Sequence, residues 1–234
     1  VMTTWNAMDR LDAADRVYAG RPNTWGQRAA NILLQQADVV VALGSRLGLQ
    51  QSGFNWQQFV PAGRVVQVDI DPAELSKGHP HVDVALQADA DDTLRALCAL
   101  PLPDPAEWMA FCRGVRAELG YDDDANVTAP GYLSPYRFVM DLARLAHADD
   151  VVIPCSSGGA FTTMMQAFDQ KAGQVVITDK ALASMGYGLS GALGAACAHP
   201  GRRVVLVEGD GGFSQNLQEL ATVVVNRLPL KIFL

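Results

Sequence analysis

The sequence predicts an α/β protein built from two doubly wound parallel-sheet domains. Hydrophobic residues make up 49% of the 234 residues and charged residues 18%, which is typical of a chain that folds around an apolar core. Short apolar runs alternate with segments of helical periodicity, the pattern of parallel strands buried on both faces. A proline-rich break at residues 101–108 separates two such series.

The first series predicts an α/β domain over residues 1–100. Residues 24–36 fit a helix, because Thr24 and Gln27 have the spacing of a capping box and apolar residues mark one face. A second helix is predicted over residues 89–100. Strands are predicted over residues 37–44, 63–71 and 81–89.

A linker, partly packed as helix, is predicted over residues 101–132, and a second α/β domain over residues 133–234. Ser134 can cap a helix whose first residue is Pro135, where the missing N–H costs nothing. Strands are predicted over residues 149–159, 173–180, 202–210 and 229–234. Further helices are predicted over residues 161–168, 184–200 and 214–228.

Charge and cysteine content exclude several classes of protein. The net charge of −7 argues against nucleic acid or an anionic membrane as partner, since both favour a basic surface. No apolar run reaches the roughly 18 residues of a membrane span, and no signal-peptide pattern is present. We therefore expect a cytoplasmic protein. Its four scattered cysteines lack a paired C-x-x-C spacing and are expected to be small buried or semi-buried thiols: Cys98, Cys112, Cys155 and Cys197.

Chemistry-bearing residues follow three of the predicted strands, at residues 155–159, 179–186 and 209–216. Ligands of open α/β sheets bind at the carboxyl ends of strands, and a glycine turn that opens a helix suits a phosphate. Asp210 would repel phosphate unless it held a Mg²⁺ ion that bridges to the phosphate oxygens. The local pattern therefore fits a metal–diphosphate site, and equally a glycine-rich turn in which the aspartate only caps a helix.

A longer pattern resembles the thiamine diphosphate enzymes of the acetolactate synthase and decarboxylase superfamily. It consists of LGAACAHPGRRVVLVEGDGG at 193–212, ASMGYGL at 183–189, and YAGRPNTWGQRAANILLQQADVVVALGSRL at 18–47. The resemblance covers nearly the whole chain. It implies that 1–100 is the central domain and 133–234 the thiamine diphosphate-binding domain, each incomplete at its outer end. It also implies a pyrimidine-binding domain before the central one.

The resemblance also assigns roles to individual residues. Asp210 corresponds to the metal-ligating aspartate, and Met185 to the bulky apolar residue that supports the bent cofactor and acts in catalysis. The remaining metal ligands, an asparagine and a backbone carbonyl, are expected shortly after Leu234. The residues implied to bind cofactor are Ser156, Ser157, Gly158, Ser184, Met185, Gly186, Gly209, Asp210, Gly211 and Gly212.

The activity that the resemblance implies is a thiamine diphosphate- and Mg²⁺-dependent carboligase or decarboxylase, a transferase or lyase acting on a 2-oxo acid such as pyruvate. A homodimer or homotetramer is implied as well. FAD in the central domain is left open, because Arg46 is not followed by the charged run of acetolactate synthases. Asp69 and Asp71 could hold a ribose hydroxyl, or Asp71-Pro72 could cap the next helix.

Three alternatives remain at this point. One is a non-catalytic nucleotide-binding or interaction module that keeps the fold. Another is a thiamine diphosphate lyase with a different substrate. An NAD-dependent Rossmann protein is disfavoured, because no G-x-G-x-x-G follows any predicted strand.

Overall fold

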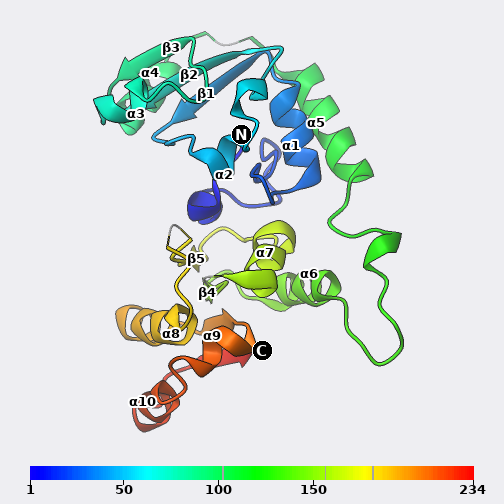
Figure 1. The fold of residues 1–234 in the computed structure, drawn as a ribbon, viewed down its shortest axis with the longest axis vertical. Helices are drawn as coiled ribbons and strands as arrows, with labels where there is room; N and C mark the ends of the chain where they lie inside the picture. Colours follow the sequence, from blue (N-terminus) through cyan, green and yellow to red (C-terminus); the bar gives the residue numbers. More distant parts are fainter. Residues whose placement is uncertain (102, 156, 181) are drawn as a thin grey trace. The chain divides into compact units, whose positions relative to one another are not determined.

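The computed structural model describes residues 1–234 apart from residues 102, 156 and 181, and it separates into two units (Figure 1). One unit contains Val1 and residues 3–21 and 121–234, and the other contains Met2 and residues 22–120. Each unit has its own parallel sheet, so the predicted α/β class with two sheets is confirmed. Among the described residues no helix has the length and apolar character needed to span a membrane.

The sheet of the 22–120 unit contains the three predicted strands, each shorter than its predicted range. They are β1 (Val39–Leu43), β2 (Arg64–Asp69) and β3 (Val84–Gln87), parallel and in the order β1-β2-β3. The helices of this unit are α1 (Arg28–Gln35), α2 (Leu49–Ser52), α3 (Pro72–Ser76), α4 (Ala90–Cys98) and α5 (Ala106–Glu118), together with the 3₁₀ helix η2 (Trp56–Gln58).

Burial in this sheet differs from the prediction of strands covered on both faces. Leu34 of α1 packs with Ala42 and Val65, which covers one face. The other face leaves apolar side chains open to solvent, since Val39 is 56% exposed and Leu86 is 45% exposed. A continuous apolar run therefore marked the strands correctly but overstated their burial.

The capping box predicted for the first helix is wrong. The helix α1 begins at Arg28, and Gln27 precedes it without a side-chain cap. The Thr24 hydroxyl donates instead to the Gln50 carbonyl at 2.9 Å, because residues 24–27 turn toward α2 before the helix starts. Thr24 and Gln27 have the spacing of a capping box, but the Thr24 hydroxyl is engaged in a tertiary hydrogen bond instead.

The sheet of the second unit has the order β5-β4-β6-β7, again parallel, and β4 and β6 are buried along their whole length. Ser134 caps the helix α6, and Pro135 occupies the first position of that helix, as predicted. The helices are the 3₁₀ helix η3 (Asp124–Asn126), α6 (Pro135–Leu145), α7 (Gly158–Ala167), α8 (Tyr187–Ala198), α9 (Asp210–Ser214) and α10 (Glu219–Val225). The strands are β4 (Val151–Ile153), β5 (Val175–Val176), β6 (Val204–Val207) and β7 (Leu230–Phe233).

The single helix predicted over residues 214–228 is wrong, because two short helices replace it. The first, α9, already begins at Asp210, and α10 begins at Glu219. Between them Asn216 turns its side chain toward α8, where its Nδ2 donates to the Gly186 carbonyl and the Ser190 hydroxyl. The backbone between the two helices makes tighter i→i+3 bonds instead: the Asn216 N–H donates to the Phe213 carbonyl, and the Glu219 N–H donates to the Asn216 carbonyl.

Residues 3–21 pack within the second unit, whereas the sequence-based boundary placed them in the domain at 1–100. They include the 3₁₀ helix η1 (Trp5–Arg10). Asp9 accepts the Val176 N–H at 3.0 Å through Oδ2, and so pairs a backbone donor of β5 at the edge of the sheet. The predicted linker differs too, because α5 lies in the 22–120 unit and packs on α1.

Arg21 fixes this segment to the end of α7. Its side chain is fully buried, and it donates through Nε to the Met165 carbonyl and through Nη2 to the Phe168 carbonyl, each at 2.8 Å. Its Nη1 donates to the Tyr18 hydroxyl and the Gln170 side chain. The last carbonyls of a helix have no partner within the helix, so this guanidinium supplies the missing donors at the C-terminus of α7.

Candidate functional site

The candidate site lies at the carboxyl ends of β4, β5 and β6. These strands are parallel neighbours, so the segments that follow them meet at one edge of the sheet. The Thr178 hydroxyl donates to the Cys155 carbonyl at 3.1 Å and so joins the segments after β5 and β4. The helices α7, α8 and α9 follow at this edge, as the sequence predicted.

Asp210 is the first residue of α9, and its side chain is exposed. Gly209 precedes the helix with extended backbone, and Gly211 and Gly212 lie inside the first turn. The sequence placed these residues in a turn before a helix, so the helix begins four residues earlier than predicted. The carboxylate therefore stands at a helix N-terminus, at the carboxyl edge, with its oxygens open to solvent.

Met185 lies against the glycines of this turn. A Cβ atom on Gly211 would lie 3.2 Å from the Met185 Cε. Met185 is 55% exposed, so it is not one of the buried methionines of the core. The structure therefore brings together two of the sequence-predicted groups, the one around Met185 and the one around Asp210.

The segment that carries Met185 has a pre-formed backbone. Gly186 has φ +89°, which a glycine adopts without strain, while Ala183 has φ +55°. Asp179 accepts the Ser184 N–H at 2.9 Å through Oδ2, while its Oδ1 is buried without a hydrogen-bond partner among the described residues. Ser184 itself is exposed. An orphaned buried oxygen and a residue in the left-handed region are features that gather at functional sites.

Glu208 fills the space between α8 and α9. Only 3% of Glu208 is exposed, and its Oε1 accepts the Gly209 N–H at 3.1 Å. A Cβ on Gly188 would lie 1.7 Å from Oε2, and one on Gly212 would lie 2.6 Å from Oε1. Burial raises the pKa of Glu208. Gly212 thus has a packing reason to be glycine, and its expected contact with a diphosphate stays a prediction.

The predicted residues after β4 are described in part, since Ser156 lies outside the described residues. The Ser157 carbonyl accepts a hydrogen bond from the Cys155 thiol at 3.2 Å. Gly158 begins α7 with φ +75°, and its carbonyl accepts from the Thr162 hydroxyl. These hydrogen bonds stay within their own turn and helix, and among the described residues Ser157 and Gly158 share the edge with Asp210 without a hydrogen bond to it.

Lys180 is a residue of this edge that sequence reasoning missed. Its amino group lies 5.0 Å from the ring centroids of both Trp5 and Phe161, a cation–π arrangement. Burial lowers the pKa of Lys180. Trp5 comes from the N-terminal segment, and no local spacing connects it with Lys180, so only the fold reveals the cluster.

A group of side chains that could hold a metal ion is found among the described residues at His147, Asp149 and Asp150. It precedes β4 and so lies at the amino edge of the sheet, away from the glycine turns. Asp150 is buried and accepts two hydrogen bonds from Arg203, at 2.6 and 2.8 Å. A carboxylate held by an arginine in this way has a structural partner already, so this group is not the candidate metal site.

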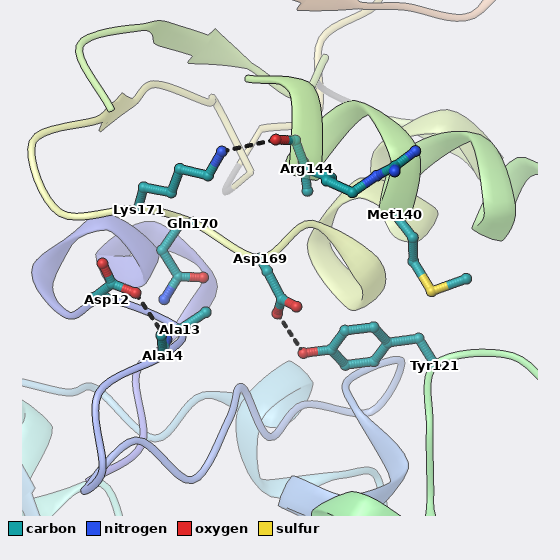
Figure 2. Close-up of a pocket in the computed structure, with 10 residues that line it drawn as sticks. Asp12, Ala13, Ala14, Tyr121, Met140, Arg144, Asp169, Gln170 and Lys171 are labelled. Carbon is teal, nitrogen blue, oxygen red and sulfur yellow. Dashed lines mark hydrogen bonds between the residues drawn. The ribbon is translucent and has the colours of Figure 1, made fainter. Parts of the chain in front are cut away.

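A cavity of about 330 Å³ also lies on the amino side of the sheet. Figure 2 shows the Tyr121 hydroxyl pointing at the Asp169 carboxylate, to which it donates at 2.6 Å. Burial raises the pKa of Tyr121. Lys171 of this cavity donates to the Arg144 carbonyl. These polar groups are paired with one another, and the residues precede β4 and β5, so the cavity is separate from the candidate site.

Residues weighed for FAD in the 22–120 unit have structural partners. The Asp71 carboxylate accepts the Ala73 N–H at 2.9 Å and caps α3, which confirms the second of the two interpretations of Asp71-Pro72. Asp69 accepts the Asp71 N–H. Arg46 pairs with Glu74 at 2.7 Å. Hydrogen bonds from Lys77 and Arg46 hold the pKa of Glu74 below its usual value.

Comparison with known proteins agrees with this geometry. Residues 1–97 match the family model of the thiamine pyrophosphate enzyme central domain, and residues 157–234 match that of the C-terminal TPP binding domain. The chain is 35% identical to the acetolactate synthase isozyme 1 large subunit of Escherichia coli K12 over 233 residues, 99% of this chain and 40% of that protein.

Two further acetolactate synthase large subunits are similar to the chain over its whole length. The chain is 32% identical to the isozyme 2 large subunit of E. coli K12, over 99% of this chain and 41% of that protein. It is 31% identical to an acetolactate synthase large subunit of Mycobacterium tuberculosis, over 100% of this chain and 38% of that protein. The chain thus spans about two fifths of the length of the curated relatives it matches.

Proposed function

The chain belongs to the thiamine pyrophosphate enzymes, and from this premise we propose that it carries the diphosphate- and metal-binding part of an acetolactate synthase-like carboligase or decarboxylase. The observation that carries the proposal is the contact between Met185 and the turn at Asp210, at the carboxyl edge of the sheet. This contact joins an apolar support to a metal-ligand type of side chain within the region that matches the TPP binding domain.

The residues at this edge fit a diphosphate and a Mg²⁺ ion. Asp210 offers exposed carboxylate oxygens, the ligand type that Mg²⁺ prefers. A Cβ on Gly209 would meet no atom within 4 Å, so the backbone before α9 is open to a ligand. Asp210 would hold the ion, and the N–H groups at the start of α9 and α7 would face the phosphate oxygens. Bound there, thiamine diphosphate supplies a carbanion and an electron sink for chemistry at a carbonyl.

The chain's own residues would position and shield the reacting groups. Met185 presents an apolar surface beside Gly211, so it can support a bent ligand and exclude water. Asp179 holds the Ser184 N–H and thereby shapes the turn that carries Met185. Oriented and water-excluded groups of this kind lower the barrier by fixing geometry before reaction.

We propose a 2-oxo acid such as pyruvate as the substrate, and a homodimer or homotetramer as the assembly. The support is that the relatives over the whole chain are named acetolactate synthases. FAD is not part of the proposal, because Asp69 and Asp71 already bond to backbone N–H groups and Arg46 to Glu74.

Turnover tests this proposal in the protein as encoded by its gene. With thiamine diphosphate and Mg²⁺ present, we expect pyruvate to be consumed, with CO₂ released, and the rate to fall to background when the metal is chelated. Cofactor binding without pyruvate turnover would point to a thiamine diphosphate lyase with another substrate. Absence of both binding and turnover would favour the non-catalytic module.

A further inference from the structure

Two side chains of residues 208–216 reach the start of α8. Asn216 and Glu208 both contact α8 within its first turn, immediately after Met185 in the chain. Neither residue has a role in the function proposed above. Both lie where they can set the distance between the segment that carries Met185 and the first turn of α9, which begins at Asp210.

Asn216 bonds this turn from one side. Its Nδ2 donates to the Gly186 carbonyl at 2.8 Å and to the Ser190 hydroxyl at 3.0 Å. A Cβ on Gly186 would lie 2.9 Å from the same Nδ2, so the amide is packed directly against the backbone. Gly186 is buried and follows Met185, and therefore a group that holds Gly186 also holds the backbone from which Met185 projects.

Glu208 packs against the first turn of α8. Its carboxyl oxygens occupy the space that a Cβ would need at Gly188 and at Gly212. Gly188 lies in the first turn of α8 and Gly212 in α9. The two helices can approach one another only as closely as this buried carboxyl allows. Asn216 thus bonds the segment after α9 to the start of α8, while the Glu208 carboxyl occupies the space between the two helices.

We propose that Asn216, working against Glu208, is a positioning residue that holds Met185 against Gly211 and so fixes the spacing between the apolar support and Asp210. The inference rests on the proposed function, because it assumes that Met185 and Asp210 serve the two ends of one cofactor. Asp210 and the N-terminus of α9 make no hydrogen bond to Asn216 among the described residues, so losing Asn216 leaves the diphosphate anchor in place.

The expected signature is a loss in kcat with little loss in cofactor affinity. The Asn216→Leu variant keeps the size of the side chain but loses both hydrogen bonds. We expect its Kd for thiamine diphosphate with Mg²⁺ to stay within about threefold of the parent, because Asp210 is intact. We expect its kcat at saturating cofactor to fall by about 10- to 100-fold, as misplacement by about 1 Å can cause.

The experiment compares Asn216→Leu with the matched control Asn226→Leu in the full-length protein. Asn226 is exposed and donates to the Thr222 carbonyl of its own helix, so it offers the same residue type without a contact to α8. Calorimetry gives the Kd, and steady-state kinetics give kcat. Hydrogen exchange of residues 182–190 in the cofactor-free protein should speed up about tenfold in the Asn216 variant only.

A double-mutant cycle ties the effect to Met185. If Asn216 acts through Met185, then Met185→Ala combined with Asn216→Leu should lower kcat scarcely more than either change alone. The inference would be overturned if the fold-losses in kcat of the two single variants multiplied in the double variant. So would an Asn216→Leu variant with parental kcat and parental exchange of residues 182–190.

Ser190→Ala is a milder variant for the case in which Asn216→Leu does not fold. Ser190→Ala removes only the acceptor at 3.0 Å and should lower kcat by about two- to fivefold with an unchanged Kd. An unchanged kcat in Ser190→Ala, together with a failure of Asn216→Leu to fold, would mean that Asn216 is only structural and would overturn the inference. If the parent protein itself binds no thiamine diphosphate, then the proposed function fails rather than the positioning role alone.

Discussion

Replacing Asp210 with alanine is expected to abolish Mg²⁺-dependent binding of thiamine diphosphate. The Asp210 carboxylate is the charged group of this turn, and a diphosphate bound beside it would require a cation to offset the repulsion between the two anionic groups. We expect the Kd to rise by at least about 100-fold, which corresponds to about 2.7 kcal/mol. Calorimetric titration in the presence of Mg²⁺ measures the change.

Asp149→Ala is the matched control for this experiment. Asp149 is an exposed aspartate in the group formed by His147, Asp149 and Asp150, at the amino edge of the sheet. Its removal should leave the Kd unchanged. Undiminished Mg²⁺-dependent binding in Asp210→Ala, or loss of binding in Asp149→Ala instead, would show that the metal is held elsewhere.

Replacing Arg21 with alanine is expected to produce the largest loss of stability. The fully buried guanidinium donates to the Met165 and Phe168 carbonyls, and without it these helix-terminal acceptors have lost their donors in a buried site. The change also opens a cavity next to Tyr18 and Gln170. We expect the free energy of unfolding of this unit to fall by about 3–5 kcal/mol. Chemical denaturation measures it.

Arg95→Ala controls for the loss of an arginine as such. Arg95 is exposed and pairs with Asp91 on the surface of α4, so its removal should change the free energy of unfolding by no more than about 0.5 kcal/mol. Arg21→Lys should recover only a fraction of the loss, since one ammonium cannot reproduce a planar fork of donors. A loss below about 1 kcal/mol in Arg21→Ala would mean that residues 3–21 contribute little to the second unit.

The strands and the chemistry of their ends were predictable from the sequence, because both depend on local pattern. Apolar runs located β1, β2, β4 and β6, whereas the glycine–aspartate segment was predicted as a turn and is the first turn of α9. Parallel strands place their carboxyl ends at one edge, where the three chemistry-bearing segments were expected. The roles of Met185 and Asp210 toward one cofactor were implied only by the family resemblance. The structure adds the contact between Met185 and Gly211.

The remaining features depend on contacts between residues distant in sequence. Arg21 bonds to carbonyls more than 140 positions away, and no periodicity points to that pairing. Asn216 lies where the predicted helix breaks, and its bond to Gly186, 30 positions away, could not be read from local spacing. Glu208 was visible as an acidic residue at the end of an apolar strand, but its packing against Gly188 required the fold.

We propose that the edge formed by Met185, Gly211 and Asp210 binds thiamine diphosphate through a metal ion. The most direct measurement is a calorimetric titration of the full-length protein with thiamine diphosphate, once with Mg²⁺ and once with a chelator. The structure predicts saturable binding with Mg²⁺ and at least about 100-fold weaker binding without it. Equal binding in both titrations, or no binding in either, would contradict the claim.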